Sequence, residues 1–188
     1  MEVICWYTLK IGGNVSNIKD FEETVDRVFD RCRKIFREEG FNDTASIMTR
    51  EYTFEQCRNL LIKKGAEYAG NVDRYANFKR QADALGMTSF EIWAVYFNKH
   101  VDAINSAIKR NPEMPTVLSE PLEGRIQDNI NYLLLDLGMT IELAGRTMKS
   151  EEGNLVVNML EIHVTEMIVL LVKLADMTKT DGVSKENQ

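Results

Sequence analysis

Residues 119–137 read SEPLEGRIQDNINYLLLDL, and this stretch decides the fold. Pro121 suits the first turn of a helix, where its missing N–H group removes no hydrogen bond, and the glutamates beside it favour the positive end of the helix dipole. Apolar residues then recur at helical spacing, at Ile126, Ile130, Leu133, Leu134 and Leu137. The pattern predicts an amphipathic helix with one buried face.

Polar residues border that apolar face. Asp128 and Asn131 are three residues apart and point to the same side of the helix, and Arg125 and Tyr132 lie close to them. A carboxylate and an amide at this border lose part of their hydration, so each needs a partner from the protein, a metal or a ligand. These residues form either a structural network between helices or part of a binding site.

Length and composition describe an ordinary globular chain. Its 188 residues suggest one domain with a sizeable core, and 44% hydrophobic with 28% charged residues is a soluble balance. The net charge of -6 argues against direct binding of DNA or RNA and against an acidic membrane surface. Charged and titratable residues interrupt the apolar window 159–177, so we expect a buried helix there and no membrane span.

The three cysteines favour a reducing compartment. Cys5, Cys32 and Cys57 are widely spaced and form no CxxC pair. We expect Cys32 and Cys57 to act as small buried apolar side chains. Because the start of the chain does not resemble a signal peptide, the cytoplasm is the expected location.

The rest of the chain predicts an all-α bundle of about five to six helices, spanning residues 16–178 as one domain. Residues 1–15 predict an extended arm or short strand, and residues 179–188 a disordered tail. A helix ends near Gly40, and a polar connection covers residues 41–51. Capping-box patterns predict helix starts at Thr53 and Thr88. A pair of glycines, Gly65 and Gly70, predicts an interruption, followed by a short helix over residues 72–86.

The segment 111–116 predicts a loop because it holds two prolines. The last helix, about residues 154–177, is apolar around much of its circumference. Such a helix is either central or shared between subunits, so we expect a homo-oligomer, with a dimer as the first guess.

Two further clusters are candidates for chemistry. The first runs from Glu67 to Lys79, and the second is Lys99-His100. Charged residues on helices are usually solvated, and a histidine near an apolar stripe is usually a satisfied core residue. His163 and Glu166 share a helix face but make a weak metal signal. The chain has no glycine-rich phosphate loop, HExxH, GxSxG or paired CxxC motif, so the common motif-defined enzyme classes find no support.

Together, these clusters resemble a known family. The resemblance is carried by Glu67-Tyr68, Asp73-Arg74, Asn77-Phe78-Lys79, Lys99-His100, Glu123 and Asp128-x-x-Asn131-Tyr132. The pattern is similar to small helical proteins of phages and prophages, which are grouped with the nucleotide-modification-associated domain 1. More distantly, it resembles the MazG-like all-α nucleoside triphosphate pyrophosphohydrolases. It covers about residues 53–140.

The resemblance implies a site that handles nucleotides with Mg²⁺. In the pyrophosphohydrolases an ExxE pair and an ExxD pair hold the metal, which bridges the triphosphate while water attacks. Asp128 matches the aspartate ahead of the tyrosine-leucine run, and Glu123 is its nearest glutamate partner, five residues away where the family has three. No clean ExxE pair occurs upstream, and Glu67 with Asp73 is the substitute.

Each candidate residue then receives a role. Asp128 and Glu123 would be catalytic, and the metal ligands would be Glu67, Asp73, Glu123 and Asp128. The phosphate-binding residues would be Arg74, Lys79, Lys99, His100 and Arg125. The residues that stack on the base would be Tyr68, Phe78 or Tyr132, and those that read its edge would be Asn77 or Asn131.

Two other functions remain open. The chain could be a non-catalytic helical module that binds a nucleotide or a host protein and acts by sequestration or counter-defence. It could also be a purely structural oligomer. An enzyme of the first kind would need Mg²⁺ and consume its ligand, whereas a sequestering protein would return the ligand intact.

Overall fold

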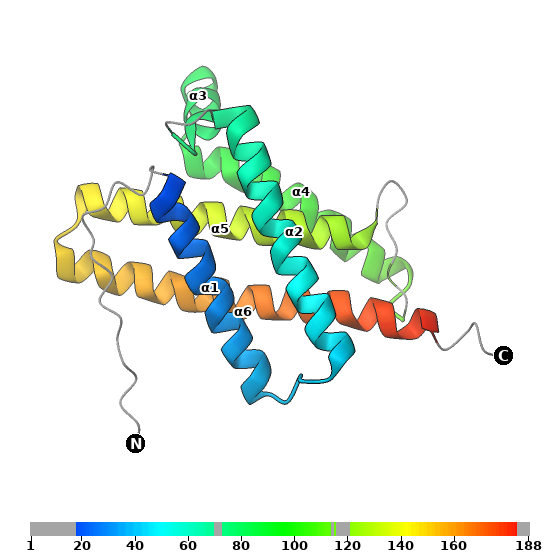
Figure 1. Ribbon diagram of the computed structural model, residues 1–188. Coiled ribbons are helices and arrows are strands. Elements are labelled where there is room, and N and C mark those ends of the chain that lie inside the picture. Colours follow the sequence, from blue (N-terminus) through cyan, green and yellow to red (C-terminus); the bar gives the residue numbers. More distant parts are fainter. Residues whose placement is uncertain (1–17, 70–72, 114, 116–120, 184–188) are drawn as a thin grey trace.

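The computed structural model describes residues 18–69, 73–113, 115 and 121–183, with side chains from 20–67, 73–113, 115 and 121–177. The predicted N-terminal arm lies outside this range. The described residues form six α-helices and no strand: α1 (Ile18–Glu38), α2 (Thr44–Ala69), α3 (Ala76–Leu85), α4 (Ser89–Arg110), α5 (Leu122–Thr147) and α6 (Ser150–Val183). The predicted all-α bundle is therefore confirmed (Figure 1).

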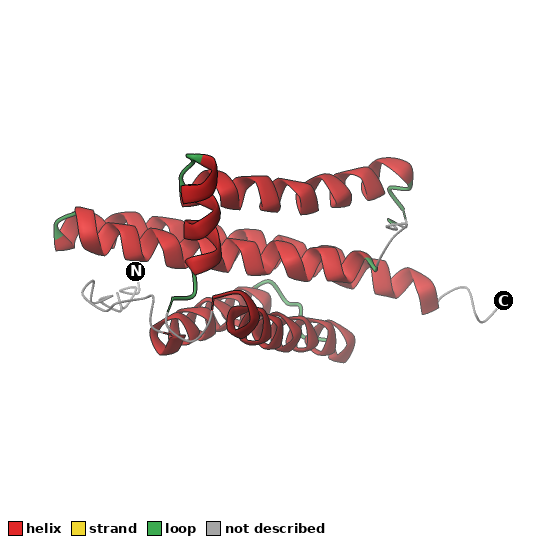
Figure 2. Ribbon diagram, turned by 90° about the horizontal axis from the view of Figure 1, so that it is seen from above, coloured by secondary structure: helices red, strands yellow, loops and turns green. Residues whose placement is uncertain are grey.

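The helices form three layers (Figure 2). α5 and α6 run antiparallel and form the middle layer. α1 and α2 cross them on one side. α4 packs on α5 from the other side, and α3 lies across the beginning of α4. Because α5 is covered on both sides, it is the central helix of the domain.

Burial follows the predicted periodicity. On α5, Ile126, Ile130 and Leu137 are fully buried, as the opening stretch predicts. On α1, an apolar stripe that includes Phe21, Val28 and Cys32 faces the middle layer. Cys32 and Cys57 are buried free cysteines, as expected, and burial raises the pKa of each thiol, so neither is a reactive thiolate at neutral pH.

The start of α2 corrects one prediction. The expected polar connection over residues 41–51 and the capping box at Thr53 are wrong, because α2 already begins at Thr44. Asp43 caps it instead, since its Oδ1 accepts a hydrogen bond from the Ser46 N–H at 3.0 Å. Thr53 lies inside the helix and its hydroxyl donates to the Thr49 carbonyl at 2.8 Å. A capping-box pattern inside a longer helix misled the prediction.

Three other boundaries differ. The interruption expected near Gly65 does not occur, since α2 continues to Ala69. α3 begins at Ala76 rather than near residue 72, after a turn at residues 73–75 in which Asp73 Oδ1 accepts from the Tyr75 N–H at 2.9 Å. α6 begins at Ser150, a turn earlier than expected, and includes Gly153. The capping box at Thr88 and Glu91 is confirmed.

α6 has an unusual surface. Its segment Ser150–Met177 is long and apolar enough to cross a membrane by length and composition, although 39% of its apolar 18-residue window is buried inside the protein. Several of its large apolar side chains are exposed, including Leu155, Met159 and Leu170. The predicted wide apolar face is therefore present, and part of it has no cover from the described helices.

Candidate functional site

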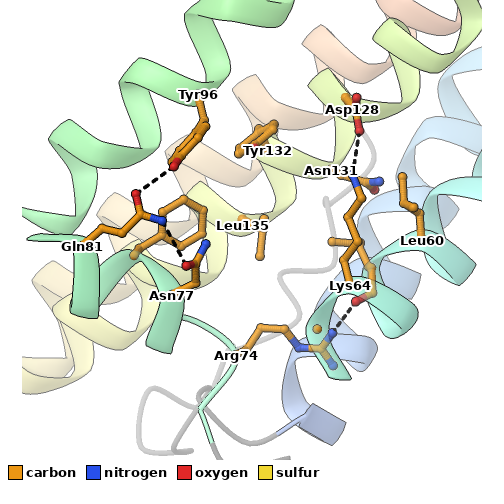
Figure 3. Close-up of a pocket in the computed structure, with 13 residues that line it drawn as sticks. Leu60, Lys64, Arg74, Asn77, Gln81, Tyr96, Asp128, Asn131, Tyr132 and Leu135 are labelled. Carbon is orange, nitrogen blue, oxygen red and sulfur yellow. Dashed lines mark hydrogen bonds and ion pairs between the residues drawn. The ribbon is translucent and has the colours of Figure 1, made fainter. Parts of the chain in front are cut away.

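A pocket of about 360 Å³ opens between four helices. This volume lies within the range of small-molecule sites. Its walls come from α2, the turn before α3, α3 itself, α4 and α5 (Figure 3). The lining residues are Leu60, Leu61, Lys64, Gly65, Arg74, Asn77, Phe78, Gln81, Tyr96, Asp128, Asn131, Tyr132 and Leu135. Six of the residues that the sequence singled out thus come together here: Arg74, Asn77, Phe78, Asp128, Asn131 and Tyr132.

One wall of the pocket is aromatic. The Tyr96 and Tyr132 rings are nearly parallel, 11° apart with centroids at 6.3 Å, and Phe78 meets Tyr132 edge-on at 6.5 Å. The Trp93 indole N–H donates to the Tyr132 carbonyl at 2.7 Å and ties α4 to α5 behind this wall. Such rings offer flat, apolar contact to a planar ligand.

A chain of amides lies beside the rings. The Tyr96 hydroxyl donates to Gln81 Oε1 at 2.7 Å, and Gln81 Nε2 donates to Asn77 Oδ1 at 3.0 Å. Across the pocket, Asn131 is only 6% exposed, and its buried Oδ1 accepts no hydrogen bond from the described residues. An unpaired buried acceptor is costly, so a donor from a ligand would be favourable there.

Arg74 is the most unusual residue of the pocket. It is only 7% exposed, yet no carboxylate of the described residues lies within ion-pair distance, and Glu22 acts on its charge only from farther away. Its Nη1 donates to the Leu61 carbonyl at 2.7 Å and its guanidinium lies 5.2 Å from the Phe21 ring centroid. Burial lowers the pKa of Arg74, although arginine stays charged in proteins. A buried cation with no direct ion pair among the described residues is a candidate binding site for an anion.

Two glycines place this arginine. A Cβ on Gly65 would stand 2.2 Å from Arg74 Nη1, so the guanidinium occupies the space that a side chain would fill. The neighbouring Tyr75 is fully buried, and a Cβ on Gly138 would stand 2.0 Å from its hydroxyl oxygen. The turn before α3 is thus held against α2 and α5 by side chains that fit at helical glycines. Gly65 marks a docking position and does not break the helix.

Asp128 is held by basic neighbours. Its Oδ1 lies 3.3 Å from Lys64 Nζ, and its Oδ2 lies 3.4 Å from His100 Nδ1. The same His100 nitrogen lies 3.1 Å from Arg125 Nη1, so His100 and Arg125 stand behind Asp128 and outside the pocket lining. The lining holds two cationic side chains, Arg74 and Lys64, and one carboxylate, Asp128. It therefore carries a net positive charge, whereas the whole chain has a net charge of -6.

The other predicted residues lie elsewhere. Lys79 bonds Asp73 at 2.8 Å and Glu142 at 3.0 Å, which places that cluster away from the pocket lining. Glu67 and Lys99 are exposed on α2 and α4, and Glu123 lies in the first turn of α5. The side chain of Tyr68 lies outside the described residues. Within the described part of the chain, no three acidic, histidine or cysteine side chains gather as metal ligands, so the Mg²⁺ site stays a prediction.

The sequence reasoning missed several lining residues. Gln81 and Tyr96 were not selected, although Gln81 follows Asn77 by one helical turn and Tyr96 precedes His100 by one turn. Spacing from a residue already selected was the available signal. Lys64 and Gly65 carried no such signal, because their role depends on the approach of α5 and of the turn before α3.

Comparison of the chain with protein-family models, with curated proteins and with solved structures finds no match.

Proposed function

We propose that the protein binds a nucleotide in the pocket between α2, α3, α4 and α5, and that it holds the ligand without hydrolysing it. The observation that carries this proposal is Arg74, a buried cation in the pocket wall with no carboxylate partner among the described residues. A phosphate would supply the missing charge through hydrogen bonds that its oxygens accept from the guanidinium.

The other walls of the pocket offer contacts that suit the base of a nucleotide. The rings of Tyr96, Tyr132 and Phe78 would contact the base, whose flat face is apolar. Asn131 Oδ1 would accept a hydrogen bond from an amino or imino group of the base. A ligand that carries an anion, a planar ring and a hydrogen-bond donor thus matches the three unsatisfied features of the pocket.

Binding without a metal is favoured by the surroundings of Asp128. Lys64 Nζ lies 3.3 Å from its Oδ1, and this cation repels a divalent metal, while His100 occupies the side of Oδ2. Sequestration needs only affinity, whereas hydrolysis of a phosphoanhydride needs a metal or an equivalent concentration of positive charge at the leaving group.

Mg²⁺-dependent hydrolysis is the second candidate, and Asp128 favours it. This carboxylate lines the same cavity as Arg74 and is 18% exposed, so a metal-bound triphosphate could compete with Lys64 for it. Under this alternative Asp128→Asn abolishes turnover and leaves the fold intact. Under the binding proposal the same change frees Lys64 and strengthens phosphate binding, by about threefold to tenfold.

A thermal-shift screen tests the proposal. The protein is melted with nucleoside mono-, di- and triphosphates, each with Mg²⁺ and with a chelator, and the ligand is recovered and analysed afterwards. A ligand that binds only the folded state raises the melting temperature by mass action. We expect a shift that persists in chelator and a ligand that returns intact. A shift that requires Mg²⁺, together with release of pyrophosphate, would replace the proposal with the hydrolase. No shift with any nucleotide would refute both.

Asn131→Leu and Asn154→Leu form a matched pair for this screen. Both asparagines have a buried Oδ1 without a partner among the described residues, but only Asn131 lines the pocket. The first variant should lose about tenfold in nucleotide affinity, and the second should bind like the wild type.

A further inference from the structure

The outer face of α6 carries a row of exposed side chains at the spacing of a two-stranded coiled coil. We call this row the seam. Val156, Met159, His163, Glu166 and Leu170 follow one another by three or four residues in alternation, which is a repeat of 3.5 residues. All five are exposed, Met159 by 53% and Leu170 by 65%. The neighbours of α6 are α5, α1 and α2, and they cover its other side, while α4 packs on α5.

The two polar residues of the seam, His163 and Glu166, make few hydrogen bonds with the described residues of their own subunit. His163 Nδ1 lies 2.7 Å from the Met159 carbonyl, where an Nδ1–H would donate, and this leaves Nε2 for an outside group. Glu166 makes no hydrogen bond or ion pair with the side chains and backbone that the structure describes. An exposed apolar stripe with unused polar groups at its centre marks a contact surface.

We propose that this seam binds the same seam of a second copy of the chain, with the two α6 helices antiparallel. A two-fold axis between positions 163 and 166 places His163 against the partner subunit's Glu166 and Met159 against the partner subunit's Leu170. Each pairing occurs twice by symmetry. The interface is then a central layer of histidine and carboxylate side chains, enclosed on both sides by apolar layers.

The polar layer favours this antiparallel pair over a parallel pair and over a lipid surface. A parallel pair in register would set Glu166 against the partner subunit's Glu166, two like charges at the centre of the contact. A polar residue at one seam position is a known means of fixing register in paired helices. A lipid surface is a poorer occupant, because Glu166 would face hydrocarbon in the middle of the stripe.

Charge reversal and rescue test the pairing, with the molar mass of the full chain measured by light scattering and sedimentation. We expect the wild type to be a dimer. Glu166→Lys sets lysine against histidine, and His163→Glu sets two glutamates together, so each change should weaken the dimer at least tenfold. The double variant H163E/E166K sets a glutamate against a lysine at each contact and should recover most of the affinity. These positions are exposed, so circular dichroism should show folded protein in every case.

Glu151→Lys is the matched control, because Glu151 is an exposed acid of α6 outside the seam, and it should leave the dimer unchanged. A monomeric wild type at micromolar concentration would overturn the proposal. So would single variants that dimerise like the wild type, a double variant as weak as the singles, or association that appears only with detergent or lipid vesicles. None of these outcomes depends on nucleotide binding, so the dimer and the pocket are tested separately.

Discussion

Two of the buried charged groups that the structure describes, Glu161 and Arg74, differ in their ion-pair partners. Glu161 on α6 is fully buried, and two arginines of α1 reach it: Arg27 Nε at 3.1 Å and Arg31 Nε at 3.3 Å. Arg74 is almost as buried, but its close contacts are a carbonyl oxygen and an aromatic ring. Glu161 forms two direct ion pairs within the fold, whereas Arg74 forms none with the described carboxylates, and Glu22 acts on it only from beyond ion-pair distance.

The difference distinguishes a buried charge with a structural role from a buried charge with a candidate binding role. A buried carboxylate with two arginines joins α1 to α6 and leaves nothing for a ligand to add. A buried guanidinium beside a cavity leaves a charge that an anion can satisfy. A buried charged residue therefore indicates a structural role when the fold supplies its ion-pair partners, and a binding role when the fold does not.

The largest expected effect comes from removing the counter-ions of Glu161. The double variant R27M/R31M leaves an uncompensated carboxylate inside the protein and should lower the free energy of unfolding by about 3–5 kcal/mol. Urea denaturation measures this loss. Adding Glu161→Leu should recover most of it, because the buried charge is then gone. A double variant as stable as the wild type would show that the cluster does not hold α1 on α6.

Asp136 extends the comparison to a half-buried acid without an ion pair among the described residues. Burial alone raises its pKa to about 6. The folded state therefore binds its proton more tightly than the unfolded state, so this group costs stability as the pH rises through the range from about 4 to 6. Asp136→Asn should raise the free energy of unfolding by about 2 kcal/mol at pH 7, with a gain that shrinks below pH 6. A gain independent of pH would contradict the shift.

Gly65 tests how Arg74 is placed. Gly65→Ala puts a methyl group into the space of the guanidinium and should weaken nucleotide binding about tenfold, which corresponds to about 1.4 kcal/mol. Gly124→Ala is the matched control on α5, since nothing lies within 4 Å of the added Cβ. Thermal shift with ligand compares the two. Equal binding by both variants would mean that the position of Arg74 does not matter to the ligand.

The smallest effect is expected at an exposed pair. Arg58 bonds Asp26 at 3.0 Å in solvent, so Arg58→Gln should cost less than about 1 kcal/mol of stability and no ligand affinity. Urea denaturation and the nucleotide screen measure both quantities. A larger loss in either would place Arg58 among the functional charges.

Much of this architecture was predictable from helical periodicity. The stripe on α5 and the caps at Thr88 and Glu91 depend on neighbours along the chain, so the sequence contains them directly. The start of α2 was missed because a local cap pattern at Thr53 competes with a longer helix that tertiary packing extends back to Thr44.

The site was predictable only in part, for a similar reason. Asp128 and Asn131 stand out because polar residues bordering an apolar stripe need partners, whereas Arg74 and Asn77 were selected through the family resemblance. Their partners come from other helices, which no spacing along the chain reveals. The absence of a direct ion pair at Arg74 among the described residues is a property of three-dimensional packing alone.

Titration calorimetry with a nucleotide in chelator tests the central claim most directly. The best ligand of the thermal-shift screen is titrated into the wild type, Arg74→Gln and Arg58→Gln. The account predicts one nucleotide bound per chain by the wild type and by Arg58→Gln, and at least tenfold weaker binding by Arg74→Gln in a folded protein. Equal affinity in Arg74→Gln and the wild type would contradict it.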